Sequence, residues 1–419
     1  MPRVALHTLG CKVNQYETQK IAEDFRSRGF ELVDFSDEAD VYVINTCTVT
    51  RTADGKSRRA ARAAVGRNPG AKVIVTGCCV ETSEGALRGI EGVSLIVGNR
   101  EKEHLADQVA GRLSVPPLRQ SAIRNPKSEM RVRTRALLKI QDGCDQFCAY
   151  CAVPLARPTM HSRPFDEAFS EARDLARRGH REIVLTGIRL GRYEFGLTEL
   201  IRAISDLPGV ERIRLSSIEL TDIPPDLLDV MASDGKVCRH LHVPLQSGDD
   251  GVLARMRRPY TAAEFEAFVT RIRNLVPEIG LTTDIMVGFP GETEAQFART
   301  CELAERVRFS RIHVFPYSPR PGTAAFDMGD DVSPAEKARR KARVLDLGSR
   351  RMDEFAQRMI GTTVEVIAES GGSGFTDNYV RVAFRGDSRH VGEIVRVRVE
   401  SVSRGVAHGR LVNAAGDGE

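Results

Sequence analysis

The sequence predicts an α/β protein in three parts: an N-terminal parallel-sheet α/β domain, a partial (β/α)6 barrel and a small C-terminal β-barrel. Short apolar runs alternate with helical stretches up to about residue 110, and the same rhythm returns from about residue 131 to 346. The last segment instead alternates apolar and polar residues with a period of two. Strand–helix alternation is typical of parallel sheets, whereas period-two alternation is typical of antiparallel strands.

The first segment places a cysteine after each of three predicted strands. The apolar runs at residues 4–6, 41–44 and 73–75 are followed by Cys11, Cys47 and Cys78, with helices predicted around 17–28 and from 52. Loops at the carboxyl ends of parallel strands meet at one edge of the sheet. We therefore expect the three cysteines to lie together, although they are spread over 68 positions. The alternative is that each is a small buried cysteine at a strand end. This explains one such cysteine better than it explains three in equivalent loops.

The second segment supplies the strands of the barrel. Apolar runs occur at residues 182–185, 212–215, 240–243, 281–287 and 311–315. Together with the strand before Cys144 they make about six βα units, which predicts a partial barrel. Active sites of such barrels lie at the carboxyl ends of the strands, so the loops after these strands are the expected site.

The last segment, about 361–412, is of accessory size and predicts a small antiparallel barrel or sandwich. A polar, proline-containing linker at 111–130 separates the first two segments. We expect domains at residues 1–115, 130–350 and 355–415.

The composition predicts a soluble protein of the cytoplasm. The 419 residues are 41% hydrophobic, enough to fill a core in two or three domains. No apolar run approaches the ~20 residues that span a bilayer, and the first residues lack a signal peptide, so we expect no membrane partner. Nine cysteines, an odd number, favour metal or redox chemistry over disulfides. The net charge of +4 does not by itself indicate nucleic-acid binding.

The loop of residues 139–151 is the strongest chemical motif. Cys144, Cys148 and Cys151 have the spacing C-x-x-x-C-x-x-C, with Tyr150 just before the last cysteine. Four-iron clusters normally take four cysteines, so three leave one iron open to a reactant. The motif resembles the radical S-adenosylmethionine (SAM) enzymes, in which the open iron binds SAM and an electron generates a 5′-deoxyadenosyl radical. By this resemblance Tyr150 lies near the adenine. A zinc knot or buried thiols are the alternatives, but zinc sites usually pair C-x-x-C elements.

Further motifs resemble the methylthiotransferases, which join a three-cysteine domain, a radical SAM barrel and an RNA-binding TRAM domain. The resemblance covers nearly the whole chain. The stretch at 8–18 (TLGCKVNQYET) looks like the MtaB branch, which acts on N6-threonylcarbamoyladenosine immediately 3′ of the anticodon in tRNA. The other family-like stretches are 240–248 (HLHVPLQSG), 284–292 (DIMVGFPGE) and 313–323 (HVFPYSPRPGT).

The resemblance implies two 4Fe-4S clusters and SAM as cofactors. Cys144, Cys148 and Cys151 would hold the cluster that binds SAM, and Cys11, Cys47 and Cys78 an auxiliary cluster that delivers sulfur. Cys79, Cys238 and Cys301 are interpreted as structural. The product would carry a methylthio group at C2 of the modified adenine. The implied partners are tRNA, a sulfur source and an electron donor such as flavodoxin or ferredoxin.

Other site residues follow predicted strands and resemble the positions at which family members contact SAM. Gly187, Ser217, Glu219 and Gln246 are expected to contact SAM, since carboxylates and amides can bond its hydroxyl and amino groups. Where relatives show R-G-x-x-R-S-R, this chain has Arg157-Pro158-Thr159-Met160-His161-Ser162-Arg163. The candidates for phosphate contact are Arg157 and Arg163 in this stretch and Arg339, Arg340 and Arg343 in the predicted basic helix before the C-terminal domain.

Three functional hypotheses remain open at this point. The first is methylthiolation of threonylcarbamoylated adenosine in tRNA. The second is the same chemistry on isopentenyl-adenosine in tRNA or on an aspartate of a ribosomal protein. The third is a non-catalytic RNA-binding protein stabilised by zinc.

Overall fold

A computed structural model describes residues 1–113, 134–369, 371–385 and 390–412. Most of the predicted linker at 111–130 therefore lies outside the described residues. The contacts divide the chain into two compact units. The first comprises the described residues of Met1–Val132, Asp142–Met160 and Ser318–Asp327, and the second those of Arg133–Gln141, His161–Tyr317 and Met328–Glu419. This division assigns the cysteine loop to the first unit, whereas the domain boundaries expected at 1–115, 130–350 and 355–415 stay predictions.

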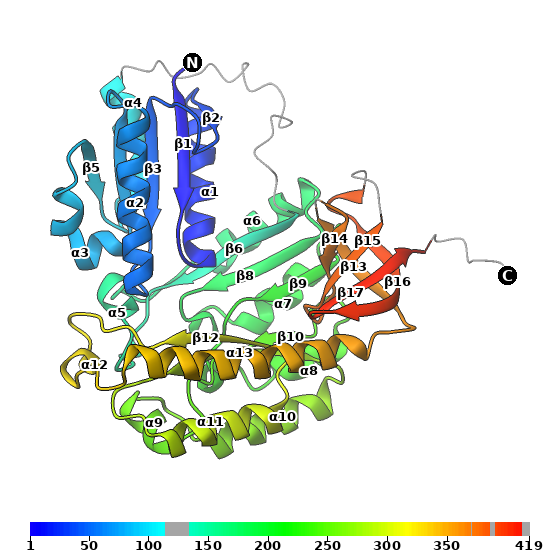
Figure 1. Ribbon diagram of the computed structural model, residues 1–419. Helices are drawn as coiled ribbons and strands as arrows, with labels where there is room; N and C mark the ends of the chain where they lie inside the picture. Colours follow the sequence, from blue (N-terminus) through cyan, green and yellow to red (C-terminus); the bar gives the residue numbers. More distant parts are fainter. Residues whose placement is uncertain (114–133, 370, 386–389, 413–419) are drawn as a thin grey trace. The chain divides into compact units, whose positions relative to one another are not determined.

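The first unit is built on a five-stranded parallel sheet with the order β2-β1-β3-β4-β5 (Figure 1). Its elements are β1 (Arg3–Thr8), α1 (Lys12–Ser27), β2 (Glu31–Val33), β3 (Val41–Thr46), α2 (Arg51–Arg67), β4 (Lys72–Gly77), α3 (Cys78–Arg88), β5 (Val93–Val97), η1 (Lys102–His104), α4 (Leu105–Leu113), α5 (Val153–Ala156) and α12 (Ala324–Asp327). The strand order reverses between β1 and β3, which is where parallel sheets bind ligands.

Helices cover both faces of this sheet because its strands carry apolar side chains on both sides. Tyr42 and Ile44 pack against α2 and α3, whereas Val41 and Val43 pack against α1 and α4. A strand buried on both faces reads as a continuous apolar run, as this one does. The predicted parallel α/β fold of the N-terminal segment is confirmed.

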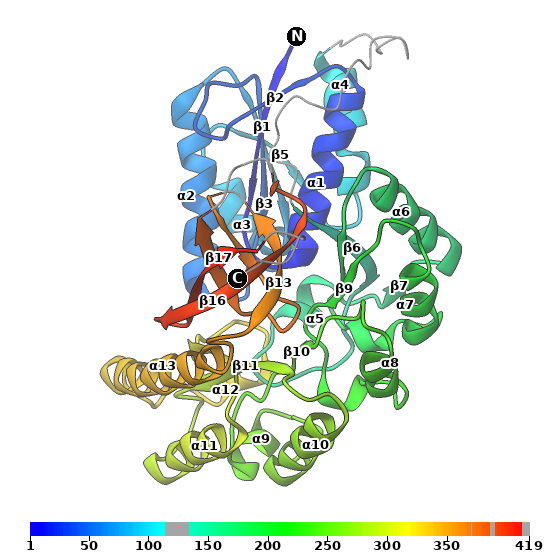
Figure 2. The same cartoon turned by 90° about the vertical axis from the view of Figure 1, so that its right-hand side faces the viewer.

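The second unit contains the partial barrel. Parallel pairs join β6, β8 and β9 and, separately, β10, β11 and β12. Single bridges join Ile213 of β9 to Val237, and Ser217, just after β9, to His242 of β10. Figure 2 shows the helices lying outside these strands. The elements are β6 (Arg135–Asp142), β7 (His161–Ser162), α6 (Phe165–Arg177), β8 (Glu182–Gly187), η3 (Leu190–Arg192), α7 (Leu197–Ser205), β9 (Arg212–Leu215), η4 (Leu220–Asp222), α8 (Leu227–Ser233), β10 (His240–His242), α9 (Asp250–Arg255), α10 (Ala262–Leu275), β11 (Gly280–Val287), α11 (Glu294–Val307), β12 (Arg311–Pro316) and α13 (Pro334–Gln357).

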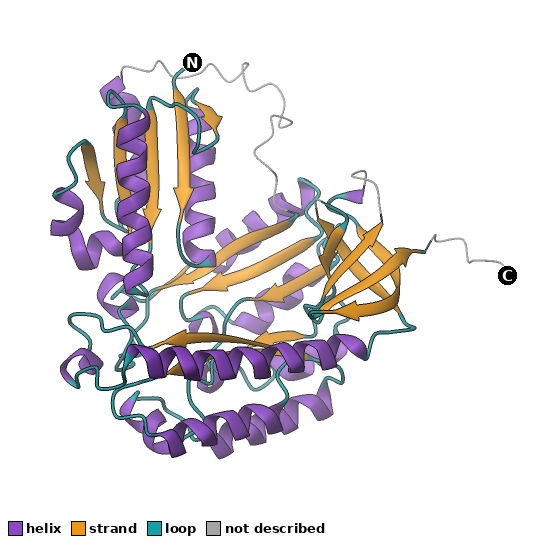
Figure 3. Cartoon of the chain, viewed as in Figure 1, coloured by secondary structure: helices purple, strands orange, loops and turns teal. Residues whose placement is uncertain are grey.

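The C-terminal strands close into a five-stranded barrel with the order β13-β14-β15-β17-β16 (Figure 3). They are β13 (Thr363–Glu369), β14 (Ser373–Phe375), β15 (Arg381–Arg385), β16 (Ile394–Ser403) and β17 (Val406–Leu411). The small barrel is confirmed, but the expectation that it is wholly antiparallel is wrong, because β15 and β17 pair in parallel. Phe355 of α13 joins its core.

Within the second unit, this small barrel docks on the amino ends of the larger barrel's strands. The side chain of Arg214 donates to the backbone carbonyls of Thr376 (3.0 Å) and Asp377 (2.8 Å). Its Nε also donates to Glu182 (2.7 Å), and both side chains are at most 2% exposed. Burial alone would raise the pKa of Glu182, but the neighbouring guanidinium of Arg214 more than offsets this and the pKa lies below its ordinary value. The ion pair therefore helps fix the C-terminal barrel.

We predict that Arg214→Leu lowers the free energy of unfolding by about 3–5 kcal/mol, since it leaves Glu182 buried without its cation. The double variant Arg214→Leu/Glu182→Leu should recover part of this loss. The depressed pKa of Glu182 makes its contribution present above about pH 4.3 and lost as the pH falls further. Denaturant unfolding across pH measures both effects.

The matched control is Arg306→Gln, which breaks an exposed ion pair with Glu266 and should cost at most about 1 kcal/mol. Equal losses for Arg214→Leu and Arg306→Gln would contradict the importance of the buried pair.

Candidate iron–sulfur site

Cys11, Cys47 and Cys78 follow the carboxyl ends of three adjacent strands. Cys11 immediately precedes α1, Cys47 directly follows β3, and Cys78 begins α3. Because β1, β3 and β4 are neighbours in one parallel sheet, all three cysteines lie at the same edge. The structure thus brings this predicted set together.

Two glycines allow the cysteine loops to approach one another. A Cβ at Gly10 would lie 2.8 Å from Cβ of Cys47, and a Cβ at Gly77 would lie 2.5 Å from the backbone of Thr46. Gly77 has φ 98° and ψ −173°, a conformation that is essentially confined to glycine. Side chains at these positions would push the loops apart.

Asn14 fixes the loops after β1 and β3 in place. Its side-chain amide donates to the carbonyls of Leu9 and Thr46, both at 2.8 Å, although Asn14 itself is buried. Asn45 in turn donates to the carbonyl of Asn14 at 3.1 Å. The sequence analysis missed this role, because nothing in the local pattern shows that one amide bridges two loops 37 residues apart.

The thiols in this unit differ in their surroundings. Burial, together with the negative charges that Cys78 and Cys11 can carry, raises the pKa of the Cys47 thiol to about 11. Cys79 is fully buried, and burial together with Asp54 raises its pKa to about 12. Mutual repulsion among Cys11, Cys47 and Cys78 suits a site in which positive iron neutralises three thiolates.

The loop that carries Cys144, Cys148 and Cys151 follows β6 and turns tightly. A Cβ at Gly143 (φ 79°) would lie 1.9 Å from the carbonyl oxygen of Thr159, so only glycine fits there. Backbone N–H groups of Gln146 and Val153 donate to the Sγ atoms of Cys144 and Cys151, each at 3.4 Å. Such bonds stabilise thiolates and are common around iron–sulfur ligands.

The donor set and its surroundings fit iron–sulfur clusters. Each triad offers three thiols from glycine-tightened loops, and the Nε2 of Gln146 is buried without a hydrogen-bond partner within the described structure. Among the described residues, no group of three or more His, Cys, Asp or Glu side chains has the geometry for a single metal ion. A four-iron cluster places each thiolate on a different iron, so its ligands stand farther apart than those of one ion.

Arg157 connects the two cysteine sets within the first unit. Its Nε donates to Sγ of Cys78 at 3.4 Å, and its backbone carbonyl accepts from the N–H of Cys144 at 3.1 Å. Its side chain is 3% exposed and forms a two-pronged ion pair with Glu17. Burial lowers its pKa, but the carboxylates of Glu17 and Asp142 and the nearby Cys78 raise it overall, so the guanidinium stays charged. The structure thus places Arg157 inside the protein and not on a surface that could meet phosphate.

The SAM-binding candidates of the second unit lie after the barrel strands. Gly187 ends β8, Ser217 and Glu219 follow β9, and Gln246 follows β10. Gln246 is a non-glycine residue with φ 64°, a rare conformation that often marks functional sites. Glu219 forms an ion pair with Arg258, which the sequence analysis did not identify. Tyr150, from the first unit, is half-buried in the cysteine loop.

The arginines predicted to bind RNA are mostly engaged with carboxylates. Arg163 donates to Glu171 at 2.6 Å and Arg340, which is buried, donates to Glu292 at 2.8 Å. Arg339 and Arg343 are about half exposed, but both lie near Glu294.

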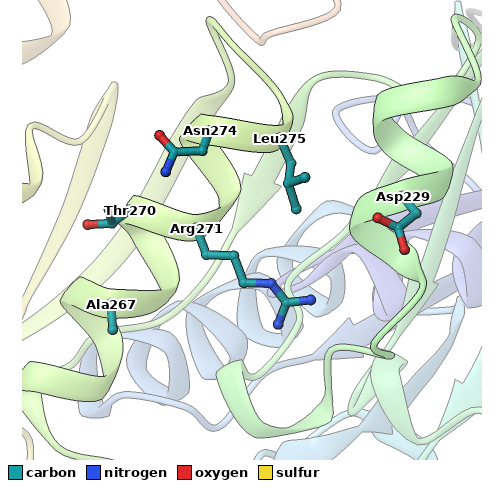
Figure 4. A pocket seen from close by; sticks show the side chains of 6 residues that line it. All are labelled: Asp229, Ala267, Thr270, Arg271, Asn274 and Leu275. Atoms are coloured by element: carbon teal, nitrogen blue, oxygen red, sulfur yellow. The ribbon is translucent and has the colours of Figure 1, made fainter.

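Figure 4 shows a surface pocket between α8 and α10 in the second unit, on the helical layer and not at the strand ends. Its lining residues are Asp229, Ala267, Thr270, Arg271, Asn274 and Leu275. The sequence analysis did not predict this pocket.

Comparison with known proteins identifies the class. Residues 3–98 match the family described as Uncharacterized protein family UPF0004, residues 138–304 the Radical SAM superfamily and residues 357–412 the TRAM domain. The radical SAM methyltransferase TsrM from Kitasatospora setae is similar in fold, with a TM-score of 0.57 and 18% identity over 78% of this chain and 77% of that chain. A three-cysteine loop after the first strand of such a barrel defines a radical SAM enzyme, which uses SAM and an iron–sulfur cluster.

Curated relatives narrow the class to a family. The chain is 38% identical to the threonylcarbamoyladenosine tRNA methylthiotransferase MtaB of Bacillus subtilis, over 100% of this chain and 98% of the relative. It is 37% identical to MtaB of Thermotoga maritima, over 96% and 95%. It is also 35% identical to a tRNA-2-methylthio-N(6)-dimethylallyladenosine synthase of Dehalococcoides mccartyi, over 99% of each chain. The chain therefore belongs to the methylthiotransferase family of radical SAM enzymes. No helix in the described structure is long and apolar enough to cross a membrane.

We predict that Gly77→Ala lowers the free energy of unfolding by about 1–3 kcal/mol or more and reduces the iron bound after anaerobic reconstitution, because the new Cβ meets the Thr46 backbone. Gly85→Ala in α3 is the matched control, since a Cβ there meets no atom within 4 Å. It should raise helix stability by about 0.5–1 kcal/mol and leave the iron content unchanged. Equal iron content in both variants would contradict the packing requirement at Gly77.

Proposed function

We propose that this enzyme adds a methylthio group to C2 of N6-threonylcarbamoyladenosine, immediately 3′ of the anticodon in tRNA. The observation that carries the proposal is the full-length similarity to MtaB relatives together with two cysteine triads in one compact unit. The 35% identity to dimethylallyladenosine synthases supports the alternative substrate, isopentenyl-adenosine.

The proposed cofactor contacts are the cysteines of the two triads and the residues that resemble the SAM-contacting positions of the family. Cys144, Cys148 and Cys151 hold the cluster that binds SAM, and Cys11, Cys47 and Cys78 hold a second, auxiliary cluster. When bound, the first supplies the electron that cleaves SAM and the second presents sulfur. Tyr150, Gly187, Ser217, Glu219 and Gln246 orient SAM. The Glu219–Arg258 ion pair holds that carboxylate in a fixed position for hydroxyl groups.

The proposed partners supply what the chain itself lacks. Each turnover consumes two SAM molecules, a sulfur atom and electrons, so a sulfur source and a reductant such as flavodoxin or ferredoxin are required. The cytoplasm is the proposed location, because tRNA is there.

The experiment on substrate compares two anticodon stem-loops, one with threonylcarbamoyl-adenosine and one with isopentenyl-adenosine, in anaerobic reactions read by nucleoside mass spectrometry. Methylthio product from the first alone supports the proposal. Methylthio product from the isopentenyl-adenosine stem-loop alone would instead identify isopentenyl-adenosine as the substrate. Product from neither, with SAM cleavage intact, would contradict methylthiolation of tRNA.

The two triads are predicted to divide the chemistry. With Cys11, Cys47 and Cys78 replaced by Ala, the enzyme should still convert SAM to 5′-deoxyadenosine, because the ligands of the SAM-binding cluster are unchanged. Methylthiolated product should fall below detection. The reciprocal variant, with Cys144, Cys148 and Cys151 replaced by Ala, should lose both activities and retain about half of the iron. Methylthiolated tRNA from the first variant would overturn this division.

We propose that the main phosphate-binding surface is a row of arginines on the C-terminal barrel. Arg385 pairs with Arg410, and Arg410 pairs with Arg398, in direct register across β15, β17 and β16. All three side chains are exposed, although Arg410 also lies 3.4 Å from Glu400. Like charges directly opposite one another destabilise a sheet, so a bound polyanion would make the row more favourable. The RNA backbone supplies such charges. Arg163, Arg339 and Arg343 stay secondary candidates.

We predict that replacing Arg385, Arg398 and Arg410 with Gln weakens tRNA binding and reduces the slope of log affinity against log salt by about 3. The melting temperature should stay equal or rise, since repulsion is removed. The control, Arg339→Gln/Arg343→Gln, should change the slope less, because those charges are already shared with Glu294. A larger change in the salt slope for Arg339→Gln/Arg343→Gln than for the triple variant would instead place the main RNA contacts on α13.

A further inference from the structure

The guanidinium of Arg157 is saturated with acceptors. Its Nε donates to Cys78, one terminal nitrogen donates to Glu17 and Asp142, and the other donates to Glu17 and Asn14, at 2.7–3.4 Å. Arginine has five N–H groups, and all five have a partner here. A lysine has three donors and no planar fork, so it cannot reproduce this set.

The acceptors of Arg157 belong to both cysteine regions. Cys78 and Asn14 come from the edge of the N-terminal sheet, and Asn14 holds the loops after β1 and β3. Asp142 and the backbone bond to Cys144 belong to the loop that carries the SAM-cluster cysteines. The side chain and the backbone carbonyl of Arg157 therefore connect the two cysteine triads.

The surrounding charges balance without Cys78. Lys102, also buried, pairs with Glu17 and donates to Asn99 at 2.8 Å. Two cations, Arg157 and Lys102, thus face two carboxylates, Glu17 and Asp142. The hydrogen bond to Cys78 is therefore not required to neutralise these charges, yet the guanidinium of Arg157 is oriented so that its Nε donates to Sγ of Cys78.

A hydrogen bond from a cation to a ligand sulfur stabilises negative charge on a cluster, and a reduced cluster carries one more negative charge than an oxidised one. Such bonds therefore raise the reduction potential. Fixed loops also keep the separation of two clusters constant, which matters when one site must present sulfur to a substrate activated at the other.

We propose that Arg157 is a positioning residue that links the two cysteine triads and raises the reduction potential of the cluster on Cys11, Cys47 and Cys78 through its N–H···S bond to Cys78. This inference rests on the proposed auxiliary cluster.

The test uses the full chain with Cys144, Cys148 and Cys151 replaced by Ala, so that only the auxiliary cluster remains. The added variant is Arg157→Gln/Glu17→Gln, which removes one cation and one anion, so that Lys102 and Asp142 remain as one cation and one carboxylate. A redox titration followed by electron paramagnetic resonance should give a lower midpoint potential than the parent, with unchanged iron content. Arg157→Lys should give an intermediate potential.

The control is Arg28→Gln/Asp107→Asn, which removes another ion pair of the same unit, between the end of α1 and α4. Its potential should equal that of the parent, which separates the sulfur bond from general loosening. An unchanged potential in Arg157→Gln/Glu17→Gln with the cluster intact would overturn the tuning role while leaving the proposed function standing. Absence of iron in the parent would overturn both.

The linking role has its own measurement in the chain with both triads intact. Reduced clusters that lie close together broaden each other's resonance signals. Arg157→Gln/Glu17→Gln should change this broadening, whereas Arg28→Gln/Asp107→Asn should not. Identical broadening in all three proteins would overturn the link.

Discussion

The close meeting of the loops after β1, β3 and β4 is the constraint on which the candidate site depends. Three thiols can converge there only because Gly10 and Gly77 carry no side chain, since Cys47 and the backbone of Thr46 occupy the space that a Cβ at these positions would need. Asn14 then ties two of the loops together, and Arg157 ties the edge of the sheet to the second cysteine loop. The buried guanidinium of Arg157 fixes the relative positions of these loops, because all five of its N–H groups find acceptors in one orientation only.

In the C-terminal barrel, the residues that dock it on the larger barrel differ from those proposed to bind RNA. Backbone carbonyls of Thr376 and Asp377 accept bonds from Arg214, so this segment docks the barrel and is occupied by the protein itself. The exposed arginines of β15, β16 and β17 lie elsewhere on the small barrel, which leaves them accessible to a polyanion.

Much of the fold was predictable because strand runs and cysteine spacing are local signals. The parallel N-terminal sheet, the barrel strands and the position of each cysteine after a strand all follow from patterns within a few residues. The parallel pairing of β15 with β17 was not predictable, since period-two alternation is the same in both directions. The burial of Arg157 and Arg340 was also missed, because a basic residue in a sequence does not show whether Glu17 or Glu292, over 45 positions away, will face it. The roles of the SAM-contacting residues stay predictions.

The central claim is that six cysteines in two groups of three hold two separate clusters. Anomalous diffraction at the iron edge, from crystals of the anaerobically reconstituted enzyme, tests it most directly. The account predicts two peaks of iron density, one bonded to Cys11, Cys47 and Cys78 and the other to Cys144, Cys148 and Cys151. A single iron peak, or a signal at the zinc edge in place of iron, would contradict it.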